Sequence, residues 1–124
     1  MNENKLLGRW GEETAARYLK KKRYKIAAMG YNTRFGEVDV IAENRDFVVF
    51  CEVKLRKNDE HGAAREFVGA GKQKRVIAAA SRWLQENETE KQPRFDVIEI
   101  YAPEGVNTKK PGITHLESAF WQGK

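Results

Sequence analysis

The chain is short of the residues and runs that mark several classes of protein. Its one cysteine, Cys51, allows no intramolecular disulfide and no multi-cysteine zinc site. No apolar run approaches the roughly 20 residues of a membrane-spanning helix, and the mean hydropathy is −0.74. Residues 1–5 contain no basic stretch followed by an apolar core, so we expect no secretory signal. These absences predict a cytoplasmic protein with no membrane partner.

The length is that of one ordinary domain. We expect the 124 residues to fold as a single unit over 1–124. A chain of this size can bury about two-thirds of the surface that its unfolded state exposes. It therefore needs no disulfide to hold a core together.

The charges are distributed unevenly along the chain. Two segments, 14–36 and 54–75, together carry +11, whereas the whole chain carries +5 and the remainder therefore −6. Between these basic segments, residues 37–53 contain five acidic residues and one basic residue. Because a modest net charge alone identifies no partner, this acidic centre between basic arms is the feature to explain.

Hydrophobic spacing predicts an α/β fold. Helical periodicity covers 4–22 and 72–87, and runs rich in β-branched and aromatic residues predict strands at 24–29, 36–42, 47–54, 94–101 and 113–120. The order is αβββαβ with a further C-terminal strand, which is typical of one mixed sheet flanked by helices. The second and third strands are joined by a short polar turn and should form an antiparallel hairpin.

The acidic residues of strand 36–42 are predicted to lie on one face. Side chains alternate along a strand, so Glu37 and Asp39 should point the same way. Val38 and Val40 should then share the opposite face.

Glu52 and Lys54 should likewise share a face of strand 47–54, with the Val53 carbonyl between them. This strand is otherwise apolar, and burial of charge there is costly unless the charge is paired or binds a metal. With Asp39 on the adjacent strand, Glu52 and that carbonyl offer oxygen ligands to a hard cation. We therefore expect Mg²⁺ or Mn²⁺ as cofactor, with Lys54 orienting a water or stabilising charge on phosphate.

The first predicted helix adds a third carboxylate. At helical spacings of three and four residues, Glu12 neighbours Gly8, Ala15 and Ala16, which places it at the margin of the apolar face. We expect Glu12 to reach the acidic cluster directly or through water, as a further metal ligand.

Basic residues flank this predicted site and are candidates for binding nucleic-acid phosphates. They lie in the loop 56–71 and at the start of the second helix, where backbone N–H groups also favour anions. The candidates are Arg56, Lys57, Arg65, Lys72, Gln73 and Lys74. Gln73 lies on the apolar stripe of its helix, so a buried hydrogen bond to backbone and a contact with substrate phosphate are equally good readings.

Each short pattern also has an ordinary explanation. A Glu-x-Lys pair in a strand is commonly a surface salt bridge, and a basic loop can serve solubility alone. Cys51 is expected to be a buried, inert thiol. His115 and Asp96 are expected to be structural. It is the combination of Glu12, Asp39, Glu52 and Lys54 that favours a site.

This combination resembles a known signature. Asp39 followed on the next strand by Glu52-Val53-Lys54 resembles the PD-(D/E)XK motif of restriction-endonuclease-like nucleases, with Val38 in place of the usual Pro. The sequence from 8 to 120 also resembles the YraN family of bacterial endonuclease-like proteins, which are related to Holliday-junction resolvases. The segments that carry this resemblance are 11–12, 36–39 with Asn32, 50–56, 72–73 and 94–97.

The resemblance implies a restriction-endonuclease-like αβββαβ core. It also implies that Asp39 and Glu52 bind Mg²⁺, that Lys54 assists the attacking water and that Glu12 completes the acidic cluster. The leading hypothesis is a metal-dependent endonuclease acting on DNA, including branched or recombination and repair DNA. The alternatives are a nucleic-acid-binding module that keeps the fold without efficient chemistry, and a protein-interaction domain. Because junction resolvases make paired cuts, a homodimer is also a possible state of this protein.

Overall fold

The element order confirms the α/β prediction. The computed structural model describes residues 3–57 and 69–120. Its elements are α1 (Glu3–Lys21), β1 (Lys25–Thr33), β2 (Gly36–Glu43), β3 (Phe47–Arg56), α2 (Ala70–Glu86), β4 (Gln92–Tyr101), the 3₁₀ helix η2 (Gly105–Asn107) and β5 (Gly112–Phe120). This is the expected αβββαβ order followed by a final strand. No helix in the described ranges is long and apolar enough to cross a membrane.

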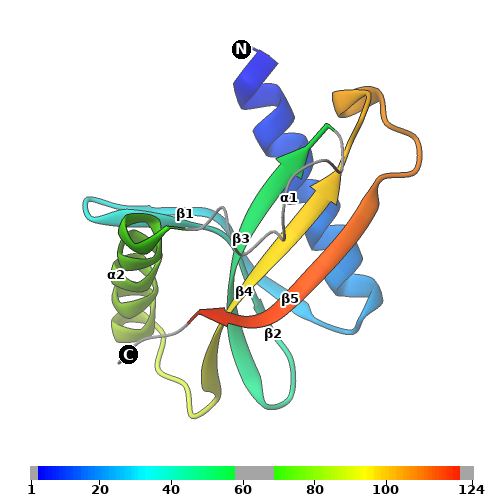
Figure 1. Ribbon diagram of the computed structural model, residues 1–124. Helices are drawn as coiled ribbons and strands as arrows, with labels where there is room; N and C mark the ends of the chain where they lie inside the picture. Colours follow the sequence, from blue (N-terminus) through cyan, green and yellow to red (C-terminus); the bar gives the residue numbers. More distant parts are fainter. Residues whose placement is uncertain (1–2, 58–68, 121–124) are drawn as a thin grey trace.

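The five strands form one mixed sheet in the order β1-β2-β3-β4-β5. β3 and β4 are parallel, with α2 as the crossover between them, and the other neighbouring strands are antiparallel. The hairpin predicted for the second and third strands is confirmed as β2–β3, and a second hairpin joins β1 to β2. Figure 1 shows α1 and α2 on opposite sides of the sheet.

Each helix covers its own hydrophobic core. On the α2 side, Phe50 and Val76 are fully buried and pack in one cluster with Trp83. The Phe50 ring meets the Trp83 ring edge-on, with centroids 5.8 Å apart. On the α1 side, Leu19 packs with Val49 and Cys51. β3 supplies buried residues to both cores, as its continuous apolar run predicts for a central strand.

Two predicted strand limits were wrong. The first strand continues through Gly30, whose φ of +59° only glycine adopts without strain, and reaches Thr33. Pro93 lies inside β4 and does not precede it. The strand tolerates this proline because β4 pairs with β5 only from Phe95 onward, so on that side Pro93 has no ladder bond to lose.

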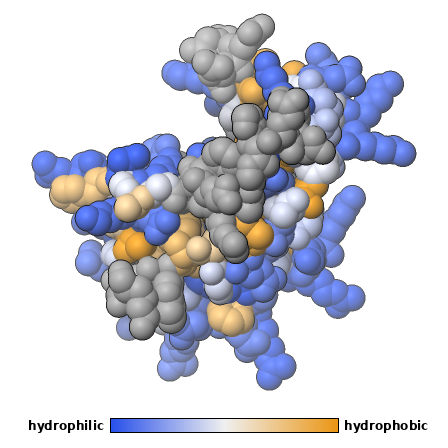
Figure 2. Space-filling model, in the orientation of Figure 1, coloured by the Kyte–Doolittle hydropathy of each residue, from blue (hydrophilic) through white to orange (hydrophobic). Residues whose placement is uncertain are grey.

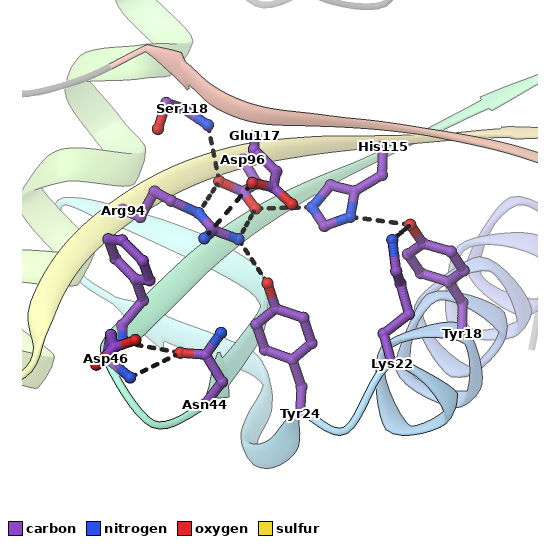
Figure 3. Close-up of polar contacts among 11 residues, drawn as sticks. Tyr18, Lys22, Tyr24, Asn44, Asp46, Arg94, Asp96, His115, Glu117 and Ser118 are labelled. Atoms are coloured by element: carbon purple, nitrogen blue, oxygen red, sulfur yellow. Dashed lines mark hydrogen bonds and ion pairs between the residues drawn. The ribbon is translucent and has the colours of Figure 1, made fainter.

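A buried polar network ties β4, β5 and α1 together (Figure 3). The fully buried Asp96 accepts hydrogen bonds from Arg94 (2.8 Å), from His115 Nε2 (2.7 Å) and from the Ser118 N–H (3.0 Å). His115 Nδ1 is in turn hydrogen-bonded to the Tyr18 hydroxyl at 3.0 Å. Asp96 and His115 are structural, as predicted, because together they join an edge strand to the first helix.

Candidate active site

The site forms where β2 and β3 stop pairing. Their backbone register runs from Glu43↔Val48 to Val40↔Cys51 and then ends, although β3 continues beside β4 to Arg56. Beyond this end, the N–H of Val53, two residues after Cys51, donates a 2.8 Å hydrogen bond to Oδ2 of Asp39, the residue before Val40. The Asp39 carboxylate thus satisfies a backbone donor that the departing strand no longer reaches.

The predicted alternation of side chains fails at this point. Val38 packs in the α2-side core and Val40 in the α1-side core, so they do not share a face. Asp39, between them, lies where the register of β1 and β2 places Gly30 opposite. The positive φ of Gly30 and the end of β3 pairing let β2 turn about its axis here. Glu37 is exposed, whereas Asp39 turns inward.

Glu52 is the buried acid at the centre of the site. Its side chain is 5% exposed, and its Oε2 lies 3.6 Å from Nζ of Lys72 and 3.9 Å from Nζ of Lys54. Its other oxygen, Oε1, is buried and has no hydrogen-bond donor. Glu52 and Lys54 share a face of β3 as predicted, whereas the pairing of Lys72 with Glu52 was not foreseen.

The two carboxylates of Asp39 and Glu52 perturb each other. Burial raises the pKa of Glu52 to about 7; the negative charge of Asp39 adds to this increase, and Lys72 and Lys54 oppose it. Burial also raises the pKa of Asp39, against the effect of the Val53 N–H. The pair is close enough to share a hydrogen bond when one member is protonated. Such paired, desolvated carboxylates are typical of functional sites.

Glu12 approaches this pair from α1. Its Oε1 lies 3.6 Å from the position that a Cβ on Gly30 would occupy, so its carboxylate lies over the strand residue opposite Asp39. Burial raises the pKa of Glu12 to about 7, and the charges of Asp39 and Glu37 add to the increase. Within 3–57 and 69–120, however, no group of three or more acidic, histidine or cysteine side chains could hold a metal. The role of Glu12 as third metal ligand therefore stays a prediction.

The six predicted phosphate-binding residues lie in different environments. Lys57 and Lys74 are exposed, Lys72 contacts Glu52, and Gln73 is half-buried on α2. Arg56 forms a 2.7 Å ion pair with Glu99, with side chains only 12% and 14% exposed, which favours a structural role over phosphate binding. Arg65 lies outside the described residues.

Comparison with known sequences places the chain in a family. The profile described as "Uncharacterised protein family UPF0102" matches residues 11–100. The chain belongs to this family. A UPF0102 protein from Syntrophotalea carbinolica is 43% identical over 95 residues, 76% of this chain and 77% of its own length. One from Alkaliphilus oremlandii is 41% identical over 120 residues, 94% of this chain and 99% of its own length. The UPF0102 match spans all four predicted catalytic positions, from Glu12 to Lys54.

Proposed function

We propose that this UPF0102 protein is a metal-dependent nuclease that hydrolyses phosphodiester bonds in DNA. The observation that carries the proposal is the buried acidic pair of Asp39 and Glu52, with the ammonium groups of Lys72 and Lys54 at 3.6 Å and 3.9 Å from Glu52. The resemblance of Asp39 and Glu52-Val53-Lys54 to the PD-(D/E)XK signature supports it, as does the αβββαβ order.

The residues fit a hard divalent cation such as Mg²⁺ or Mn²⁺. Oε1 of Glu52 is a buried carboxylate oxygen without a donor, which is unfavourable unless a proton or a cation occupies it. Asp39, Glu52 and the Val53 carbonyl would hold the ion, because Mg²⁺ takes one or two carboxylates and completes its shell with water and phosphate oxygens. When bound, the ion would supply a nucleophilic water and offset charge on the phosphate.

The chain's own residues would then divide the remaining tasks. Lys54, 31% exposed, is free enough to contact a phosphate while staying 3.9 Å from Glu52. Lys72, at the start of α2, would stabilise negative charge beside Glu52. The exposed Lys57 and Lys74 would hold flanking phosphates.

One observation favours a second function, a nucleic-acid-binding module without efficient chemistry. In the described parts of the chain, the acidic side chains do not form a group of three that could hold a metal. Catalysis would then have to rely on a two-carboxylate site. The two functions differ in cleavage but share salt-dependent binding.

Cleavage of labelled linear, nicked and branched DNA with Mg²⁺ or Mn²⁺ tests the proposal. The wild type should cut at least one substrate, and Lys54→Ala, Asp39→Asn and Glu52→Gln should each abolish cutting. Asp46→Asn is the matched control, because this acid is 73% exposed in the β2–β3 turn, away from the acidic pair. If wild type cuts no better than Lys54→Ala on every substrate, the nuclease function is wrong, and binding without cutting would favour the second function.

A further inference from the structure

The tip of the β1–β2 hairpin carries an exposed aromatic ring beside an arginine. Phe35 is 66% exposed, the most exposed of the large hydrophobic side chains in the described residues. The Arg34 guanidinium lies 5.2 Å from the centroid of the Phe35 ring. Figure 2 shows hydrophobic and hydrophilic surface side by side where this hairpin projects, at the left. An exposed aromatic ring next to a cation is a typical surface for stacking a nucleobase.

The tip is held rigid by its own turn. Oγ1 of Thr33 accepts hydrogen bonds of 3.1 Å from the N–H groups of Phe35 and Gly36 and donates one of 2.9 Å to the Gly36 carbonyl. The backbone around Phe35 is therefore fixed before any ligand arrives. A fixed backbone leaves less conformational freedom to be lost on binding, which favours affinity.

The hairpin is also fixed against α2. A Cβ on Gly36 would stand 2.0 Å from the Arg75 carbonyl oxygen, so the two backbones pack directly together. Further along, the Tyr31 hydroxyl donates a 2.7 Å hydrogen bond to Glu86. These contacts fix the position of Phe35 relative to α2. Because Lys72 of α2 pairs with Glu52, they also fix Phe35 relative to the acidic pair.

Between the hairpin and α2 lies an open groove of about 530 Å³, lined by both aromatic and polar side chains. Tyr31 and Phe35 supply aromatic surface, and Asn32, Ser81 and Gln85 supply hydrogen-bonding groups. This volume falls within the range of about 300–1,000 Å³ typical of ligand pockets. The groove therefore offers both a stacking surface and polar contacts for base edges.

The charge of this region suits a phosphate backbone. Neither Arg34 nor Arg75 forms an ion pair with an acidic residue in the described part of the chain. The one acid that lines the groove, Glu86, is neutralised by Arg82 at 3.0 Å. On α2 the groove begins at Ala78, six residues after Lys72. Six helical residues span roughly 9 Å, which is the length of about three stacked nucleotides.

We infer that this groove binds an unpaired nucleobase, with Phe35 stacking on the base and Arg34 meeting its phosphate. This inference rests on the proposed function for its ligand, and it narrows the substrate to nucleic acid with a single-stranded segment beside the acidic pair. In the interior of a duplex both faces of every base are already stacked, so Phe35 has no free face to stack on there.

Binding by fluorescence anisotropy, in EDTA to prevent cleavage, tests the inference. The probes are a labelled oligodeoxyuridine, an oligouridine of the same length and a blunt DNA duplex. Phe35→Ala should weaken binding of the single strands about 5- to 100-fold and leave duplex binding within about twofold. Phe35→Trp, which keeps an aromatic ring at this position, should retain single-strand binding. Met29→Ala, which removes another exposed apolar side chain of the same hairpin (42% exposed), is the control and should change neither.

The outcomes separate this inference from the nuclease proposal. Equal losses on single strands and duplex, no loss in Phe35→Ala, or no binding at all would each overturn the stacking role. Selective loss in Phe35→Ala without cleavage by the wild type would overturn only the nuclease function. Preference for one of the two single strands would identify the sugar that the groove accepts.

Discussion

The backbone N–H of Val53 donates a 2.8 Å hydrogen bond to the side chain of Asp39, one strand away. This bond replaces the strand pairing that ends at Val40 and Cys51. It fixes the Asp39 carboxylate next to Glu52, which precedes Val53 in β3. The site is thus built into the point where β2 leaves β3, and its acids are held by backbone rather than by flexible loops.

Glu52→Gln should stabilise the metal-free protein at alkaline pH. The pKa of Glu52 is about 7 in the folded state, above its usual 4.5, so the folded state holds the proton more tightly than the unfolded one. The contribution of Glu52 to stability should therefore be fully present below about pH 4.5 and should be lost as the pH rises through 7.

Urea unfolding at pH 8 and at pH 4 measures this effect. We expect Glu52→Gln to gain about 1–3 kcal/mol at pH 8, because the pKa of about 7 already includes the opposing effect of the two lysines. At pH 4 the two proteins should have nearly equal free energies of unfolding. Destabilisation of the variant at pH 8 would contradict the raised pKa.

Lys72→Ala should raise the pKa of Glu52 further. Lys72 lies 3.6 Å from Glu52 and lowers its pKa, so its removal leaves burial and Asp39 with less opposition. Carbon-13 NMR of the glutamate carboxyl groups would follow this titration. The neighbouring exposed Lys74 supplies the control, because Lys74→Ala should leave the Glu52 titration unchanged. An unchanged titration in Lys72→Ala would show that the ion pair does not persist in solution.

Asp96→Asn should destabilise the fold strongly at neutral pH. It would leave Arg94, with a side chain 8% exposed, without its main counter-charge and weaken the bond to His115. We expect a loss of about 3–5 kcal/mol in urea unfolding at pH 7. His115 and Arg94 hold the pKa of Asp96 below its usual 3.8 despite burial, so this contribution is present above that pH and is lost as the pH falls through the folded pKa.

Glu117→Gln is the matched control for this network. Glu117 also faces Arg94, at 3.8 Å, but its side chain is 56% exposed. Its replacement should change stability by less than about 1 kcal/mol, as for most surface pairs. Equal effects of the two substitutions would show that burial of Asp96 does not determine its contribution.

Much of this fold was predictable from local patterns. The apolar run 47–54 predicted a central strand, and the two-residue period placed Glu52 and Lys54 on one face. The same rule failed for Val38 and Val40 because β2 twists where it loses its neighbour. Gly30, which has a positive φ and lies opposite Asp39, belongs to another strand, so no local pattern of β2 reveals it.

The errors at the site arose from long-range pairing. Arg56 looked like a loop cation, but β3 extends to it and β4 brings Glu99 to its side. The sequence pattern predicts no role for Phe35, because it ends the first strand before Gly30 and makes residues 30–35 a loop, whereas β1 extends to Thr33. Nothing near Phe35 in the sequence indicates that α2 packs against the hairpin.

Gly36→Ala should test that packing. The added methyl would stand 2.0 Å from the Arg75 carbonyl, a backbone atom that cannot rotate away. We expect a loss of at least about 2–3 kcal/mol in urea unfolding, as for other overpacked buried sites. Gly8→Ala is the control: nothing lies within 4 Å of its added methyl, and alanine favours the helix by about 1 kcal/mol. Similar stability of the two variants would contradict the close contact of hairpin and helix.

Divalent cations should stabilise the wild type through the acidic pair. A cation that binds only the folded state raises the melting temperature as the logarithm of its concentration relative to its dissociation constant, and it would occupy the donor-free Oε1 of Glu52. We expect Mg²⁺ or Mn²⁺ to raise the melting temperature of wild type in a concentration-dependent way at pH 8. Asp39→Asn and Glu52→Gln should lose this increase, and Asp46→Asn should retain it because Asp46 is an exposed acid in the β2–β3 turn. Glu12→Gln tests whether the third carboxylate binds the cation. Loss of the increase in melting temperature would make Glu12 a ligand, and a retained increase would restrict cation binding to Asp39 and Glu52.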